Sequence, residues 1–174
     1  SISAMSAEEY PELPTFDLTK KIEVKQDILK SMINQTSYAA STSENKPVLT
    51  GELFDIENGN FRVVAIDGFR TETIECQDNY HFVVPKKALS EVSGLIKEDS
   101  GDKTCCIYTN NKHIIFEVNG FYVISRLLEG EFHNYKSSIP SDYKTEIILN
   151  KRDMLTCMER CSLLLNDKNR APVR

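Results

Sequence analysis

Three carboxylates lie close together in the sequence and are the residues best placed for hydrolytic chemistry: Asp67, Glu72 and Glu75. Alternation along a strand would put Asp67 and Glu75 on one face of a sheet, but no metal-ligand motif surrounds them. A hydrolase or nuclease needs carboxylates clustered around a metal, or a nucleophile with a neighbouring base. We therefore predict a protein without catalytic residues of its own.

The remaining reactive residue types do not form a known motif. Three histidines stand in unrelated contexts: His81, His113 and His133. Neither a P-loop nor a dinucleotide-binding fingerprint is present. The cysteines are odd in number and form no C-x-x-C motif: Cys76, Cys105, Cys106, Cys157 and Cys161. We interpret them as reduced structural thiols rather than a zinc site, and we expect no metal and no cofactor.

Composition limits the kinds of partner. The chain has 174 residues and a formal net charge of −5, with a pI near 5.3. This balance excludes a simple basic DNA-binding domain, whose affinity comes from neutralising phosphates, but it allows a locally basic face. No apolar run approaches the roughly 20 residues that span a bilayer. The first ten residues lack the features of a signal peptide, so we expect a cytosolic protein.

Apolar periodicity predicts an α+β fold in which antiparallel sheets carry helices on one side. Helices are expected over residues 27–40, 85–97 and 151–165, with Pro85 in the first turn of the second. Strands are expected over residues 20–24, 48–56, 61–66, 70–76, 80–84, 103–109, 113–118, 121–127 and 144–149. Turns at residues 58–60 and at Asn119-Gly120 are typical of hairpins.

Two strand-to-helix junctions resemble each other at a shift of 126 residues. Four positions are identical: Lys25 and Lys151, Asp27 and Asp153, Leu29 and Leu155, Met32 and Met158. In both segments the aspartate lies near the helix start, where the helix dipole favours it. Two explanations stay open, namely chance similarity and tandem domains of which the second begins near Tyr143.

Six short phrases follow one another along the chain. They occupy residues 7–14 (AEEYPELP), 48–51 (VLTG), 64–70 (VAIDGFR), 83–89 (VVPKKAL), 125–132 (SRLLEGEF) and 160–164 (RCSLL). In this order and spacing they resemble the bacterial DNA polymerase beta sliding clamp, over essentially all 174 residues. The family's chains are about twice this long.

The resemblance implies a DNA-clamp fold with tandem similar domains. Residues 1–17 would be the end of the first domain and a connector, residues 18–142 the second domain, and residues 143–174 the start of the third. Such a protein catalyses no reaction and acts as a processivity factor of the polymerase. Two chains would form a homodimeric ring around duplex DNA. The alternative is a peptide-binding interaction module that forms no ring.

The resemblance also implies partners. These are double-stranded DNA of any sequence, the DNA polymerase III catalytic subunit, the clamp loader and other proteins carrying a clamp-binding peptide of the Gln-Leu-x-Leu-Phe type. No membrane is involved, and the location is the bacterial cytoplasm, at the nucleoid during replication.

The family's peptide pocket corresponds to eight positions here: Leu49, Ile66, Gly68, Phe69, Arg70, Thr71, His133 and Ser138. Gly68 would let a peptide approach the backbone, and Arg70 would donate to peptide carbonyls. The usual His-Arg-Leu after Asp67-Gly68 is Phe69-Arg70-Thr71 here. Ile66 replaces a usual Thr, His133 a usual Pro and Ser138 a usual Val. Thr71, His133 and Ser138 make the pocket more polar, while Ile66 and Phe69 add apolar surface.

The family's DNA-facing helices correspond to basic residues here: Lys25, Lys30, Lys46, Lys86, Lys87, Lys97, Lys151 and Arg152. A sliding surface should touch phosphates loosely and without reading bases. The competing interpretation is that each is a solvated lysine or arginine on a surface helix.

Overall fold

The computed structural model describes residues 15, 21–43, 45–66, 68–76, 78–97, 101–139 and 142–163. The chain divides into two compact units, Ser1–Tyr135 and Lys136–Arg174. None of the helices in the described ranges is long and apolar enough to cross a membrane.

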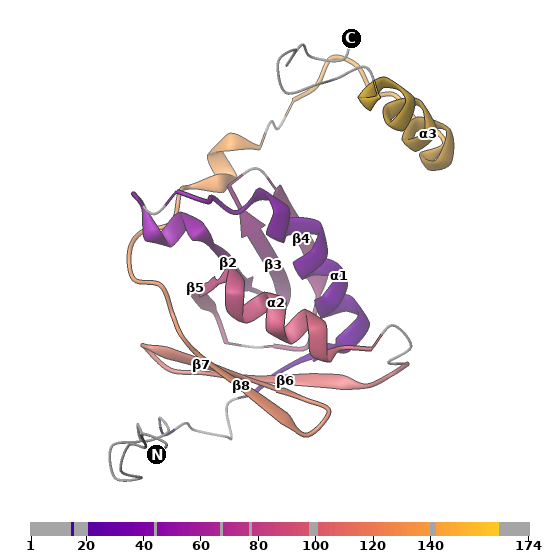
Figure 1. Cartoon of the computed structure of the whole chain (residues 1–174). Coiled ribbons are helices and arrows are strands. Elements are labelled where there is room, and N and C mark those ends of the chain that lie inside the picture. The colour runs from indigo at the N-terminus through magenta and orange to yellow at the C-terminus, as the bar shows by residue number, and fades with distance from the viewer. Residues whose placement is uncertain are drawn as a thin grey trace, which may run out of the picture. The chain divides into compact units, whose positions relative to one another are not determined.

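The first unit combines two antiparallel four-stranded sheets (Figure 1). One has the strand order β1-β6-β7-β8, and the other has the order β4-β3-β2-β5. The strands are β1 (Ile22–Lys25), β2 (Gly51–Glu57), β3 (Asn60–Ala65), β4 (Gly68–Thr73), β5 (Tyr80–Pro85), β6 (Thr104–Thr109), β7 (His113–Val118) and β8 (Phe121–Arg126). The predicted antiparallel α+β fold is therefore confirmed.

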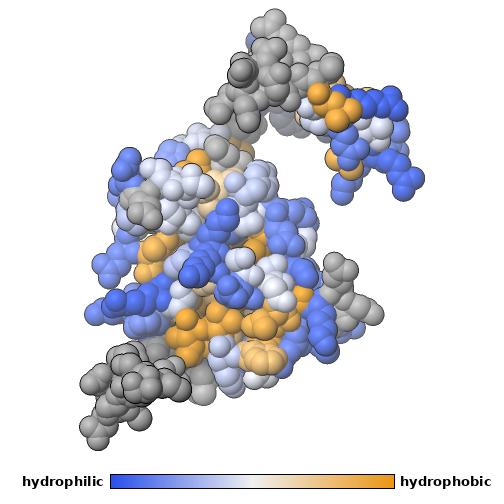
Figure 2. All heavy atoms as spheres, viewed as in Figure 1, coloured by the Kyte–Doolittle hydropathy of each residue, from blue (hydrophilic) through white to orange (hydrophobic). Residues whose placement is uncertain are grey.

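Two helices, α1 (Gln26–Thr36) and α2 (Lys86–Leu95), lie side by side over the β4-β3-β2-β5 sheet (Figure 1). Their apolar stripes, including Leu29, Met32 and Leu89, are fully buried against strand residues such as Phe54 and Phe116. Figure 2 shows this side of the molecule: hydrophilic residues predominate over the helices, and hydrophobic ones gather over the β1-β6-β7-β8 sheet. The helices thus form one layer with a polar outer surface.

Both predicted hairpin turns are confirmed. Asn58 and Gly59 have φ values of 52° and 75°, and Asn119 and Gly120 have values of 51° and 81°. Two consecutive residues with positive φ define a type I′ turn, which asparagine followed by glycine favours. The first turn pairs β2 with β3, and the second pairs β7 with β8.

Several predicted elements differ from the structure: the first helix ends at Thr36 rather than at residue 40, and the strand expected over residues 70–76 is β4, Gly68–Thr73. The strand expected from Val48 begins only at Gly51, because the 3-10 helix η3 (Pro47–Thr50) precedes it. Pro85 is the last residue of β5 and has extended backbone (ψ 134°). It occupies the N-cap position of α2 and is not part of the first helical turn. Residues 144–149 form no strand, because a strand requires a paired neighbour and no described residue pairs with this segment.

The second unit contributes the helix α3 (Lys151–Ser162) and most of the 3-10 helix η4 (Tyr135–Ser138). The side chain of Asn150 accepts hydrogen bonds from the backbone N–H groups of Arg152 and Asp153, a favourable N-cap. Leu155 and Met158 are 54% and 45% exposed, whereas their repeat partners Leu29 and Met32 are fully buried in α1. The apolar stripe of α3 is therefore uncovered in the described part of the chain.

Candidate partner-binding surface

Cross-strand pairing arranges the outer face of the β4-β3-β2-β5 sheet, the face away from the helices, into two rows. The apolar row runs through Phe69, Val64, Leu53 and Val83, which are direct neighbours across β4, β3, β2 and β5. The polar row runs through Thr71, Arg62, Asp55 and His81 in the same strand order. Residues two apart on a strand point to the same face, so the rows lie side by side.

Three residues of the apolar row belong to a small apolar cluster on this face. Val48, Leu53, Val64, Val83 and Phe132 are all less than 10% exposed and pack together. Leu49, Leu128 and Tyr135 pack against this cluster from its edge. It is separate from the main core between the sheets and the helices.

Three of the eight predicted pocket residues lie beside this cluster. Leu49 packs against it, and Phe69 lies directly across from its member Val64 with 52% of its surface exposed. Ile66 follows Val64 by two residues and is 40% exposed. Large apolar side chains that stay accessible beside a packed cluster are typical of a peptide-binding surface.

Arg70 and Gly68 lie elsewhere. Alternation along β4 puts them on the helix side, where Arg70 pairs across from Val63. The Arg70 guanidinium forms a 2.7 Å ion pair with Glu72. A Cβ atom on Gly68 would meet Ala39 at 3.4 Å and the Tyr38 hydroxyl at 3.7 Å, so the 3-10 helix η2 (Ser37–Ala39) already lies beside this glycine. The structure therefore separates Arg70 and Gly68 from Phe69 and Thr71.

The last two predicted pocket residues follow the cluster in sequence. His133 is exposed and comes directly after the buried Phe132. Ser138 belongs to the second unit. Asp67, one of the three carboxylates considered for hydrolytic chemistry, lies outside the described residues.

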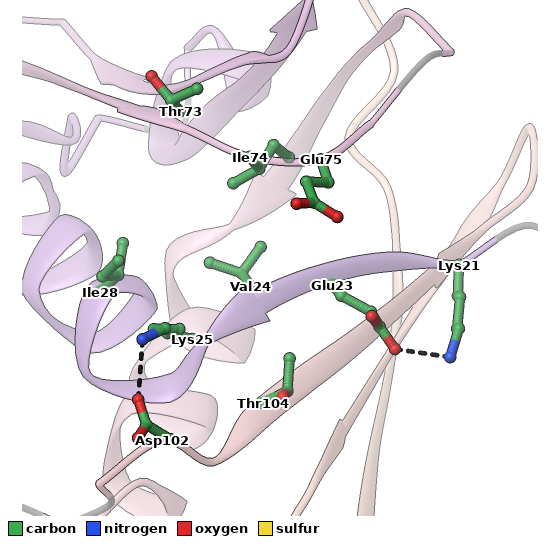
Figure 3. Close-up of a pocket in the computed structure, with 10 residues that line it drawn as sticks. All are labelled: Lys21, Glu23, Val24, Lys25, Ile28, Thr73, Ile74, Glu75, Asp102 and Thr104. Atoms are coloured by element: carbon green, nitrogen blue, oxygen red, sulfur yellow. Dashed lines mark hydrogen bonds and ion pairs between the residues drawn. The ribbon is translucent and has the colours of Figure 1, made fainter.

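Two of the predicted DNA-facing lysines are held by intramolecular contacts. Lys30 Nζ donates a 2.7 Å hydrogen bond to the carbonyl oxygen of Ile96, at the C-terminal end of α2. Lys25 Nζ forms a 2.8 Å ion pair with Asp102 beside a cavity of about 390 Å³ (Figure 3). Lys21 lies beside the same cavity and forms a 2.6 Å ion pair with Glu23 (Figure 3). Lys21 and Lys25 therefore both have carboxylate partners. This cavity contains none of the predicted pocket residues.

Four further predicted DNA-facing lysines lie in the first unit. Lys87 and Lys97 are exposed at the two ends of α2, Lys86 is half-buried beside Lys87, and Lys46 is exposed in the loop before Pro47. Among the described residues none of the four forms an ion pair. Lys151 and Arg152 are exposed in the first turn of α3, in the second unit.

Comparison with known proteins decides the family. The model of the DNA polymerase III beta subunit, central domain, matches residues 23–134. The chain belongs to the DNA polymerase III beta-subunit family. The beta sliding clamp of Bacillus subtilis is 32% identical over 173 residues, which are 96% of this chain and 45% of that protein. The chain thus spans about half the length of the curated relatives it matches.

Solved sliding clamps share the fold. A crystal structure of the DNA polymerase sliding clamp from Bacillus subtilis superposes with a TM-score of 0.85 and 32% identity, covering 95% of this chain and 44% of that one. The beta chain of DNA polymerase III from Streptococcus pneumoniae superposes with a TM-score of 0.78 and 31% identity, covering 92% and 44%. The expected DNA-clamp fold is confirmed. Sliding clamps are non-catalytic accessory proteins of the polymerase, in agreement with the prediction that the chain is not an enzyme.

One feature of this beta-subunit chain was not anticipated, a buried acid at the start of β2. Glu52 is fully buried, and its Oε2 atom lies 2.5 Å from the Oγ1 atom of Thr36 at the end of α1. Burial raises the pKa of Glu52 to about 7, while the hydrogen bond that an ionised Glu52 accepts from Thr36 and the charge of Lys86 lower it by less. Its Oε1 atom is buried without a hydrogen-bond partner among the described residues.

Proton accounting supports a neutral Glu52. The Thr36 hydroxyl has one hydrogen, yet Oγ1 also lies 2.8 Å from the carbonyl oxygen of Met32. When Thr36 donates to Met32, the short contact to Glu52 requires the carboxylic acid to donate to Thr36. A protonated Glu52 therefore satisfies both contacts.

A second unanticipated feature is the polar row. Asp55 is buried, and it contacts Arg62, His81 and the hydroxyl of Tyr135. The signal was present in the sequence, because Asp55 interrupts the apolar strand 48–56 and lies across the Asn58-Gly59 turn from Arg62.

No group of three His, Cys, Asp or Glu side chains suited to a metal occurs within the described ranges, and all five cysteines are free thiols.

Proposed function

We propose that this chain is part of a ring-forming sliding clamp that encircles duplex DNA and tethers the replicative polymerase. The observation that carries the proposal is that one clamp domain has two different surfaces on opposite sides of one sheet. The outer face of the β4-β3-β2-β5 sheet offers exposed apolar residues around a packed cluster. The helix layer on the opposite side of that sheet offers exposed lysines, Lys87 and Lys97.

The domain assignment forms part of the same proposal. Residues 18–142 would be the central domain, residues 1–17 the end of the first, and residues 143–174 the start of the third. The equivalence of α1 and α3 supports it, since Leu155 and Met158 repeat Leu29 and Met32 but lack a sheet to pack against in the described residues. A third domain would cover that stripe as the two sheets cover α1.

The proposed partners follow from tethering. A polymerase held on a topologically closed ring rebinds its primer before it diffuses away, because its effective concentration at the primer stays high. The polymerase III catalytic subunit, the clamp loader and other clamp-binding proteins would share the outer face through short peptides. Two such chains would form the homodimeric ring, in the bacterial cytoplasm and at the nucleoid during replication.

On the helix side, duplex DNA would meet a weak positive surface. Lys87 and Lys97 are the strongest candidates for phosphate contact, because Lys25 and Lys30 already have partners. Loose contacts suit sliding, since each neutralised phosphate adds affinity that motion along the duplex must overcome.

A labelled Gln-Leu-x-Leu-Phe peptide tests the proposed outer-face site by fluorescence anisotropy. We expect a Kd on the order of micromolar for the unmodified chain. Phe69→Ala should raise the Kd about tenfold, because an exposed aromatic anchor carries much of the binding energy in a small interface. Arg70→Ala should raise it less, since Arg70 lies on the helix side in an ion pair with Glu72.

Phe121→Ala is the matched control, because Phe121 is an equally accessible aromatic residue (61% exposed) on the other sheet. A scrambled peptide should not bind. Equal losses for Phe69→Ala and Phe121→Ala, or binding of the scrambled peptide, would reject the outer face as the specific site.

A further inference from the structure

The connecting segment 127–135 crosses the outer face of the β4-β3-β2-β5 sheet and is fastened there at three points. At its start, the Leu128 N–H donates a 2.9 Å hydrogen bond to the carbonyl oxygen of Val83. In the middle, Phe132 is buried in the apolar cluster. At its end, the hydroxyl of Tyr135 donates a short hydrogen bond to Asp55 Oδ2. Tyr135 is also the last residue of the first unit.

The third fastening point uses an unusual acceptor. Asp55 is only 6% exposed, and a buried carboxylate is costly unless charges and hydrogen bonds compensate it. Arg62 Nη1 lies 3.7 Å from Asp55 Oδ2, and His81 Nδ1 lies 3.4 Å from Asp55 Oδ1. The Arg62 contact is too long for a strong hydrogen bond. The contact from the Tyr135 hydroxyl to Asp55 Oδ2 is shorter than those from Arg62 and His81.

The Tyr135 hydroxyl is suited to hold this position at neutral pH. Burial raises its pKa, and the hydrogen bond to Asp55 raises it further. The hydroxyl thus remains protonated and able to donate, and a hydrogen bond to a charged acceptor is stronger than one between neutral groups.

The same contacts join the connecting segment to the candidate peptide site. His133 lies between two fastened residues, Phe132 and Tyr135, so its backbone position is held on both sides. Asp55 belongs to the polar row, in which Arg62 separates it from Thr71 on the edge strand β4. The Tyr135 N–H also donates a 2.8 Å hydrogen bond to the carbonyl oxygen of His133, so a change at the Tyr135–Asp55 contact reaches a residue expected to touch a peptide.

We propose that Tyr135 and Asp55 are positioning residues of the peptide site. Their hydrogen bond holds the connecting segment, and with it His133, on the outer face in the conformation that a bound peptide meets. This inference rests on the proposed function, since it assigns roles within the same site. Neither residue needs to contact the peptide.

The test compares Tyr135→Phe with the unmodified chain in two measurements. The substitution keeps the aromatic ring and removes only the hydroxyl. Peptide Kd should rise about tenfold, the effect of losing one hydrogen bond to a charged group. Amide hydrogen exchange should accelerate at residues 132–135 and stay unchanged in α1 and α2. Tyr108→Phe is the matched control, because Tyr108 donates a 3.0 Å hydrogen bond to a carboxylate, Glu117, on the other sheet.

The outcomes separate the two proposals. Weaker peptide binding and faster exchange in Tyr135→Phe, with neither change in Tyr108→Phe, support the positioning role. If the unmodified chain binds the peptide and Tyr135→Phe binds it equally well, the positioning role is wrong and the proposed function stands. If the unmodified chain does not bind the peptide at all, the proposed peptide site is wrong and the positioning role is overturned with it.

Discussion

Replacing Glu52 with glutamine is expected to stabilise the protein by roughly 3 kcal/mol at pH 8 and by less than about 1 kcal/mol at pH 5. The reason is that burial raises the Glu52 pKa from 4.5 to about 7. Each pKa unit corresponds to about 1.4 kcal/mol of differential interaction. The neutral amide of glutamine has nearly the same shape and never ionises.

The sign follows from proton binding. Folded Glu52 holds its proton more tightly than the unfolded chain does, so unfolding releases a proton between pH 4.5 and 7. The contribution of protonated Glu52 to the free energy of unfolding is fully present below pH 4.5 and is lost as the pH rises through about 7. Above that pH the folded protein contains a buried carboxylate, which Glu52→Gln removes.

Urea unfolding at pH 5 and pH 8, followed by circular dichroism, measures the difference. Glu91→Gln is the matched control, because Glu91 is exposed on α2, and it should change the free energy of unfolding little at either pH. A stability difference between Glu52→Gln and the unmodified chain that does not grow with pH would contradict a buried acid with a raised pKa.

Gly51→Ala should destabilise the first unit by about 3 kcal/mol, the upper range for overpacking a close-packed site. A Cβ atom at this position would lie 2.4 Å from the carbonyl oxygen of Val84 and 2.7 Å from Leu128 Cδ1. The first neighbour is backbone of the paired strand β5, and the second belongs to the connecting segment. The Val84 carbonyl cannot withdraw without disturbing the pairing of β2 with β5, and the Leu128 side chain would have to change its rotamer as well.

Gly94→Ala provides the opposite expectation in the same chain. Gly94 lies in α2, and nothing comes within 4 Å of a Cβ atom added there. Alanine in an exposed helix should therefore stabilise by about 0.5 to 1 kcal/mol, because glycine loses more backbone entropy on folding. Thermal unfolding of both variants tests this pair. If both substitutions changed Tm equally and in the same direction, the close contacts around Gly51 would not determine the effect of Gly51→Ala on stability.

Local features of this fold could be predicted from the sequence, because their causes are local. The Asn58-Gly59 and Asn119-Gly120 turns follow from residues that tolerate positive φ. The helices follow from apolar spacing, as in Leu29 and Met32. The extended segment 144–149 shows the limit: its apolar residues favour a strand, but a strand also needs a neighbour to pair with.

Non-local features could not be predicted in this way. β1 pairs with β6, far along the chain, and no turn links them. The polar row draws Thr71, Arg62, Asp55 and His81 from four strands. Strand alternation also separates neighbours in sequence, so Phe69 and Arg70 face opposite sides although the family resemblance assigns both to one pocket. A sequence motif identifies candidate residues, while the sheet determines which of them can act together.

We propose that one domain presents a peptide site on its outer sheet face and a DNA surface on its helices. Two titrations of isotope-labelled protein, one with the clamp-binding peptide and one with duplex DNA, followed by amide chemical shifts, test it most directly. We predict that the peptide shifts Leu49, Phe69 and Thr71, and that DNA shifts residues around Lys87 and Lys97 in a salt-dependent manner. Peptide shifts without DNA shifts would favour the interaction module that forms no ring, and both ligands acting on the same face would contradict the assignment of peptide and DNA to opposite sides of the domain.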